Sequence, residues 1–383
     1  MNKSIYYIFT AISFAFLIAA PGRFAFGLIV CAELFFLVLS GFCISFFIKK
    51  INLQEMNSVI TVASLIFSTV LYKQIIMCIF PLAALQLSFV FYLPAVTSYV
   101  IGIIYKNIGT STKQSLANNL KLTGLFSAFA LLFYLIRDIF GYGTFTLPSS
   151  NGLIEKIIFS TESFSWCTLF ASIPGALFLV SISILLFIFV QNKFKIIERL
   201  GDSNDSVLFC SSVLIYGIGF NRESVMCNSP RKILFTAIKS YACVIISFLL
   251  SFGINKMILI PLALTELFPF FSLLIYITIS VFFEILIQVT TKKSSAEFAV
   301  SFLTLILALN EGISLLDGIL ISVSSLTCFY FLLAVLHSIE KRIQVSKKDN
   351  MFKQKGLIFL SMVVIMIALY SFNFSWLNTG VIK

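Results

Sequence analysis

The sequence predicts an all-α polytopic membrane protein, and three observations support this prediction. First, 59% of the 383 residues are hydrophobic and only 11% are charged, whereas a soluble domain carries about 25% charged residues. Second, the mean hydropathy is +1.04. Third, the apolar runs are long and lack a two-residue period, so they favour helices over strands. Because about 20 apolar residues let a helix cross a bilayer, we expect many spans.

The spans are expected in two helical modules of about six spans each, residues 1–195 and 205–383, joined by the charged segment 192–206. In the first module, spans are predicted near residues 4–20, 26–48, 57–80, 84–105, 121–141 and 167–191. In the second, they are predicted near residues 207–220, 233–254, 257–283 (interrupted by Pro261 and Pro269), 298–309, 312–336 and 355–375.

Two of these apolar runs, 207–220 and 298–309, are shorter than the roughly 17 residues that a crossing helix needs. Short or broken segments in corresponding places of two halves indicate the functional centre of many transporters. Two interpretations therefore stay open. Either these runs are half-helices, or the true boundaries of the spans lie elsewhere.

The net charge of +11 is spread over the ends of the spans. A nucleic-acid-binding protein instead gathers its basic residues on one surface, so no nucleic-acid partner is expected. The positive-inside rule places the basic loops of the first half, and the N-terminus, in the cytoplasm. The polar stretch 143–165 is expected on the opposite side. The basic residues concerned are Lys49, Lys50, Lys106, Lys113, Lys121, Lys193, Lys195 and Arg199.

Charged or strongly polar residues inside apolar spans are costly and tend to mark function. Glu284 is the strongest candidate, because a long apolar run precedes it. Asn310 and Glu311 interrupt an apolar run, which indicates either a helix break at depth or a loop. Asp138 follows Arg137 directly, so a structural ion pair is an alternative to a functional role. The acidic candidates are Glu33, Asp138, Glu266, Glu284, Glu311 and Asp317.

The sequence contains no catalytic constellation. It has a single histidine, no Walker-type glycine loop and no HExxH motif. The eight cysteines form no CxxC pair, and inside apolar spans a cysteine behaves as a small hydrophobic residue. We therefore predict no catalytic residues and no metal site in this chain.

Two similar span endings suggest a resemblance to a known family. Residues 137–144 read RDIFGYGT, and residues 338–342 read SIEKR. The first ending is similar to the Arg-Glu-x-x-Gly-x-Gly-Thr ending of the Rnf/Nqr membrane subunits, the paired RnfA/RnfE and NqrD/NqrE type. Residues 173–177 (IPGAL) resemble the Pro-Gly-Ala-Phe element of the RnfE/NqrD branch, and residues 93–102 (LPAVTSYVIG) resemble the Leu-Pro-Leu-Ile-x-Thr-Asn-Cys segment.

The second half resembles the RnfA/NqrE branch. Residues 339–342 (IEKR) are similar to its Arg-Glu-Arg ending, and residues 302–306 (FLTLI) to its Phe-Leu-Pro-Leu-Ile segment. Asp349, residues 352–353 (FK) and residues 356–358 (GLI) are similar to the short connection that precedes its last helix. The resemblance implies a divergent tandem fusion of the two branches.

In this family the two subunits pack as an inverted pair and share an intramembrane 2Fe–2S cluster, which needs cysteine thiolates. The chain departs from the family at the matching positions, which are Ala20, Tyr99 and approximately Asn310; only Cys227 could be retained. We therefore predict that this chain holds no cluster and no other cofactor. Partner subunits are expected to carry any flavin or iron–sulfur centres.

The inverted packing also conflicts with six full spans in the first module, because both modules would then start in the cytoplasm. Either segment 207–220 does not cross the membrane, or one helix of the first module is partial. Both alternatives stay open.

The resemblance implies an integral subunit of an Rnf/Nqr-like ion-translocating electron-transport complex, located in the bacterial inner membrane beside other membrane subunits. The alternative is a membrane transporter or scaffold module that kept the fold and left electron transfer, which the missing cysteines favour. An enzyme acting on membrane substrates is a weaker third possibility, because it would require a clustered acid/base set that the sequence lacks.

Overall fold

The computed structural model describes the chain in several stretches. These stretches are residues 17, 20–51, 57–96, 112–150, 152–159, 169–173, 175–176, 178–179, 182, 230–291, 298–345, 361, 364–365 and 368. The linker 192–206 and the segment 207–220 lie outside the described residues, as does most of the predicted first span and of the predicted last span.

Most of the described residues are helical, and the chain is an integral membrane protein. Within these residues, five stretches are long and apolar enough to cross a bilayer. Two further apolar helices are shorter, at Ser301–Glu311 and Leu315–Thr327. The five candidate spans are Phe24–Ile48, Ile60–Ile79, Asn119–Tyr142, Ala237–Leu259 and Thr265–Phe283.

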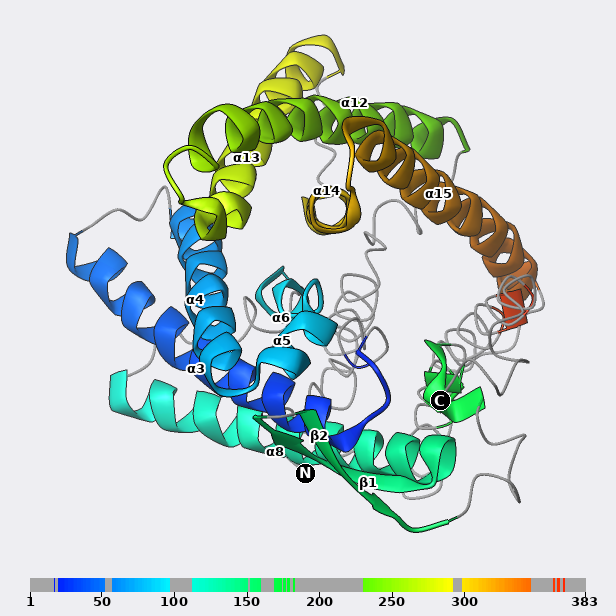
Figure 1. The fold of residues 1–383 in the computed structure, drawn as a ribbon. Helices are drawn as coiled ribbons and strands as arrows, with labels where there is room; N and C mark the ends of the chain where they lie inside the picture. Colours follow the sequence, from blue (N-terminus) through cyan, green and yellow to red (C-terminus); the bar gives the residue numbers. More distant parts are fainter. Residues whose placement is uncertain are drawn as a thin grey trace.

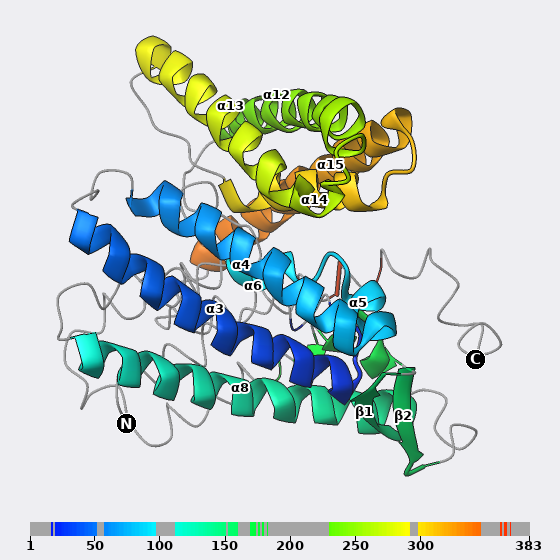
Figure 2. The same cartoon turned by 60° about the vertical axis from the view of Figure 1, so that its left-hand side comes forward.

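In the first half, three long helices lie side by side (Figure 2). They are α3 (Phe24–Ile51), α4 (Asn57–Ile79) and α8 (Thr112–Tyr142), and α3 packs against both of the others. Helix α8 begins earlier than the predicted span 121–141. A Cβ atom added at Gly27 of α3 would lie 2.5 Å from the Tyr134 ring of α8, so this glycine allows the two helices to approach closely.

The predicted single span 84–105 is wrong, because the chain breaks within it. Helix α5 (Pro81–Leu87) ends before a turn at residues 88–91, and helix α6 (Tyr92–Val96) begins after that turn. Pro94 gives the physical reason. Inside a continuous helix it would remove a hydrogen bond and clash with the preceding turn, whereas in the first turn of α6 its missing N–H costs nothing.

In the second half, the predicted span 257–283 is displaced along the chain. Helix α12 (Pro230–Ile254) continues into a π-helical turn, η4 (Asn255–Leu259). A turn follows in which Ala263 has φ +56°. The 3₁₀ turn η5 (Thr265–Leu267) then leads into helix α13 (Phe268–Thr291).

The two prolines that were expected to interrupt this span have different roles. Pro261 lies in the turn after η4, where the helix ends. Pro269 is the second residue of α13, a position that tolerates proline because the first N–H groups of a helix have no intrahelical partner.

The last two described helices agree with the predicted spans 298–309 and 312–336. They are α14 (Phe298–Glu311), which is only 14 residues long, and α15 (Leu315–Val345). Helix α14 therefore remains too short to cross a membrane alone. It packs against α12, α13 and α15, and Figure 1 shows it end-on between these helices and α6.

The two halves contact each other through a small set of elements, which we call the junction: α4, residues 88–91 and α6 from the first half, and η5, α13 and α14 from the second. The rings of Phe67 and Phe270 lie 6.1 Å apart across it. The Asn310 amide of α14 donates a hydrogen bond to the Ser88 hydroxyl, beyond the end of α5.

The prediction of an all-α chain needs one correction, because the segment after α8 forms a β-hairpin. Strands β1 (Thr144–Ser149) and β2 (Gly152–Ile157) pair antiparallel from Thr144↔Ile157 to Ser149↔Gly152. The hairpin lies at the end of α8 opposite its first turns, which carry Lys113 and Lys121. Thr144 and Thr146 of β1 donate hydrogen bonds to the Asp138 carboxylate.

Candidate functional site

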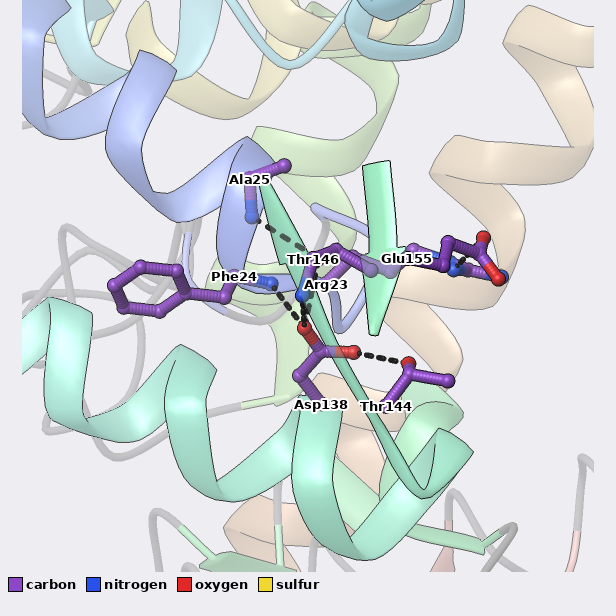
Figure 3. Close-up of polar contacts among 7 residues, drawn as sticks. All are labelled: Arg23, Phe24, Ala25, Asp138, Thr144, Thr146 and Glu155. Carbon is purple, nitrogen blue, oxygen red and sulfur yellow. Dashed lines mark hydrogen bonds and ion pairs between the residues drawn. The ribbon is translucent and has the colours of Figure 1, made fainter. Parts of the chain in front are cut away.

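Asp138, a predicted site residue, lies at the end of α8 with 0% exposure and accepts four hydrogen bonds (Figure 3). Its Oδ2 accepts from the backbone N–H of Phe24 (3.1 Å), the backbone N–H of Thr146 (2.8 Å) and the Thr146 hydroxyl (2.7 Å). Its Oδ1 accepts from the Thr144 hydroxyl at 2.9 Å. A carboxylate at the start of a helix satisfies free N–H groups and complements the helix dipole. Asp138 therefore caps α3 and fixes the hairpin to it.

The expected ion pair between Arg137 and Asp138 is not formed. The Arg137 guanidinium is 1% exposed and points to backbone carbonyls instead. Its Nη1 donates to the carbonyls of Leu17 and Ala20, both at 2.9 Å, and its Nη2 donates to that of Ala171 at 3.0 Å. Successive residues of a helix point about 100° apart, so the two charges contact different partners.

The glycines of the same motif also have structural roles. A Cβ atom at Gly141 would lie 2.7 Å from the Ala171 backbone nitrogen, and Gly143 has φ +68°. Both features exclude a side chain, the first by close approach and the second because L-residues rarely adopt that conformation. The carbonyl of Gly143 accepts the N–H groups of Ile158 and Phe159. The segment 137–144 is therefore a structural joint, and its sequence is explained without any ligand.

Glu33 is a second fully buried acid, but unlike Asp138 it has no hydrogen-bond donors around it among the described residues. It lies in α3 with 0% exposure, and neither carboxyl oxygen has a hydrogen-bond partner within the described part of the chain. The position is nine residues after Phe24, or about 14 Å along the helix. That is close to halfway through a hydrocarbon core of about 30 Å.

Tyr92 connects Glu33 to the junction. This residue, the first of α6, is 2% exposed and interacts electrostatically with both Glu33 and Glu266 of η5. Lys73 of α4 lies over the same ring, with its Nζ 5.8 Å from the ring centroid, and also interacts electrostatically with Glu266. Lys73 and Tyr92 of the first half and Glu266 of the second half therefore all belong to elements where the halves meet.

The other predicted site residues are divided between the junction and positions elsewhere. Asn310 and Glu311 are the last residues of α14; both are exposed, and Asn310 binds Ser88 across the junction. The segment after them is the short connection between α14 and α15, so both residues lie at a helix end. Glu284 lies on α13, and the placement of its side chain is outside the described features. Asp317 is exposed in the first turn of α15.

Lys73 is the main residue of this arrangement that the sequence analysis missed. A usable signal was present, because Lys73 and Gln74 are strongly polar residues inside the otherwise apolar run 57–80. Ser88 carried no such signal, since an isolated serine is common in membrane helices.

Two of the metal-ligand positions implied by the resemblance, Ala20 and Asn310, are among the described residues. Ala20 is 1% exposed, and its carbonyl accepts a hydrogen bond from Arg137. Tyr99 and Cys227 lie outside the described residues. In the part of the chain that is described, no three His, Cys, Asp or Glu side chains are grouped to hold a metal ion. The absence of a cluster and of other cofactors stays a prediction.

Comparisons with family models, with curated proteins and with solved structures find no match for this chain. The function is therefore inferred from the residues and their geometry.

Proposed function

We propose that this chain is an ion-translocating membrane subunit of an Rnf/Nqr-like electron-transport complex, with the ion path at the junction of its two halves. The chain contributes the membrane scaffold and the path. Partner subunits supply the flavin or iron–sulfur centres, and this chain carries no 2Fe–2S cluster of its own. The complex lies in the bacterial inner membrane, with the N-terminus of this chain in the cytoplasm.

One observation carries the proposal: polar and charged residues lie at the junction, where α5 ends before α6 and where α14 ends before α15. The Asn310 amide binds the Ser88 hydroxyl across it, and η5, which carries Glu266, packs against α4, which carries Lys73. In secondary transporters, discontinuous helices from two repeats form the ion and substrate site near the bilayer midplane. Charges within a membrane protein are retained mainly where they serve such a path.

The arrangement of the helices supports an inverted repeat. Helix α3 packs against α4 and α8, and α12 packs in the same order against α13 and α15. Helices α8 and α15 are each 31 residues long. Residues 93–96, the start of one family-like segment, lie in α6, and residues 302–306, the other, lie in α14; these two helices are in contact. The break at residues 88–91 supports a partial helix in the first module, which is one of the two ways to reconcile six spans with inversion.

The basic residues support the proposed orientation. Asp138 holds the end of α8 against the start of α3, so these helices are antiparallel. The end of α3 with Lys49 and Lys50 therefore lies beside the start of α8 with Lys113 (Figure 2). Basic residues gathered at one end of two neighbouring spans are typical of the cytoplasmic side.

The test is purification of the chain with its native partners, followed by a visible spectrum and by ion uptake in proteoliposomes driven by an electron donor. We expect flavin or iron–sulfur absorbance and donor-driven uptake. Lys73→Met and Glu266→Gln should each lower uptake by at least tenfold, whereas Lys341→Met, at the exposed end of α15, should not. Donor-driven uptake that survives both junction substitutions would contradict the proposed path.

A transporter that left electron transfer is the second candidate, and the residues at the implied ligand positions favour it. Ala20 has no ligand atom in its side chain, and the Asn310 amide is bound to Ser88. Under this alternative the isolated chain would move its ion down a gradient without any electron donor, and no coloured subunit would co-purify with it.

A further inference from the structure

The most unusual side chain in the described structure is Glu33. Its two oxygens are fully buried and without a hydrogen-bond partner among the described residues. Buried polar groups in native proteins nearly always have partners. An exception in the middle of a membrane span therefore requires an explanation.

A cluster of aromatic side chains packs against α3 within one turn of Glu33. Tyr72 of α4 donates its hydroxyl to the Ile29 carbonyl at 2.8 Å, one turn before Glu33 on the same face of α3. Its ring is packed between Phe36, at 5.6 Å, and Phe91, at 6.1 Å. The Tyr72 hydroxyl donates its hydrogen bond to the Ile29 carbonyl, so it joins α4 to α3 and is not available as a donor to the Glu33 carboxyl group.

An apolar enclosure of this kind tolerates a neutral carboxylic acid far better than a bare carboxylate. It also lacks the several oxygen ligands that a metal cation requires. The chemistry of the site therefore fits a proton.

We infer that Glu33 is the proton-binding group of the translocation path, and that the path reaches it from the junction beside Tyr92 of α6. This inference rests on the proposed function and names the ion as H⁺. When the junction admits water, the O–H bond of the Glu33 carboxylic acid breaks, its electron pair stays on the carboxylate, and a water molecule takes the proton as hydronium. Uptake reverses this step, and no oxidant or reductant is consumed.

The titratable groups that surround Glu33 are few. Tyr72 of α4 and Tyr92 of α6 are the described groups on neighbouring helices that interact electrostatically with it. Cys31, on α3 itself, donates to the Ser127 carbonyl of α8 at 3.8 Å. No basic side chain interacts with Glu33 in the described part of the chain, so nothing there holds it in the charged form. Lys73 is reached only through the Tyr92 ring.

The experiment uses the purified full-length chain in lipid vesicles and N,N′-dicyclohexylcarbodiimide, a lipid-soluble reagent that adds to protonated carboxyl groups. Peptide mass spectrometry then identifies the modified residues. We expect the adduct at Glu33, with labelling that decreases as the pH rises. Asp138 is an internal control: it is equally buried, but both its oxygens accept hydrogen bonds, so it should remain unlabelled.

Infrared spectroscopy provides a second measurement. The carbonyl stretch of a protonated carboxylic acid should be present in the wild-type chain and absent from Glu33→Gln, whose amide cannot bind the proton. In the transport assay, Glu33→Gln should reduce proton uptake at least tenfold, and Glu33→Asp should restore part of it with an altered pH profile.

The outcomes separate the two proposals. Ion uptake without an adduct or an acid band from Glu33 would overturn this inference and leave the proposed function standing. An adduct at Glu33 in a chain whose complex moves no ion would support the proton site and overturn the proposed function. Sodium-dependent protection of Glu33 from the reagent, without any effect of pH, would replace the proton by a metal cation and sink the inference.

Discussion

Asp138 and Glu33 are two fully buried acids on neighbouring helices, and they differ in every other respect. Asp138 accepts four hydrogen bonds, two from backbone N–H groups and two from threonine hydroxyls. Glu33 accepts none among the described residues. Burial alone therefore does not distinguish a structural acid from a functional one. The distinction comes from the donors, because a charge kept for stability must be compensated where it lies.

The comparison also separates two kinds of sequence signal. Asp138 belongs to a compact motif, and each motif residue discussed above has a contact that explains it. Glu33 is isolated in an apolar run, and nothing nearby in the sequence explains its presence. In this chain the conspicuous motif is the structural joint, and the isolated charge is the candidate for function.

The largest effect is expected at the satisfied acid. Asp138→Ala leaves the N–H groups of Phe24 and Thr146 and the hydroxyl of Thr144 buried without their acceptor. Each stranded donor costs about 1–3 kcal/mol, so the variant should lose at least ~3 kcal/mol of stability or fail to fold. Asp138→Asn keeps the shape and one acceptor oxygen, and should cost less. Thermal unfolding in detergent measures both, and a wild-type midpoint in Asp138→Ala would refute the capping role.

A smaller effect tests the turn that carries the threonines to Asp138. Gly143 has φ +68°, a conformation that costs an L-residue roughly 1–2 kcal/mol. A Cβ atom there would also lie 2.6 Å from the Phe159 carbonyl oxygen, so Gly143→Ala should destabilise the chain by at least ~1 kcal/mol. Gly253→Ala is the matched control, because a Cβ atom there meets nothing within 4 Å. Equal unfolding midpoints for the two variants would show that the hairpin does not depend on this turn.

Much of the helical part of the fold could be predicted from the sequence. Apolar length predicted α3, α4, α12, α14 and α15 at nearly their observed positions. The break inside 84–105 was missed although Pro94 was visible, because apolar length outweighed the proline in drawing that span. The hairpin was missed because its alternating Thr144–Phe145–Thr146–Leu147 pattern is short. In addition, a buried threonine hydroxyl is favourable only where an acceptor such as the Asp138 carboxylate lies within hydrogen-bond distance, and the sequence does not show that contact.

The candidate site was less accessible to sequence reasoning. Glu33 and Glu266 were both noted as charges within spans, but nothing in the sequence indicated that Tyr92 would bring them into one electrostatic network. Lys73 was not considered. The expected pairing of Arg137 with Asp138 was wrong because adjacency in a helix does not make side chains meet. Contacts between residues that are far apart in the chain depend on tertiary packing, and the spacing of residues in one sequence does not reveal that packing.

The smallest effect on stability, and the sharpest test of the comparison, is expected at the unsatisfied acid. Glu33→Leu removes a polar group that has no partner and replaces it with an apolar side chain among Tyr72, Phe36 and Phe91. Replacing buried, uncompensated polar groups by apolar ones of similar size is often neutral or stabilising. We therefore expect an unfolding midpoint equal to or above that of the wild type, together with the loss of proton uptake. A fall as large as that of Asp138→Ala would mean that Glu33 has a structural partner, and the contrast between the two acids would no longer hold.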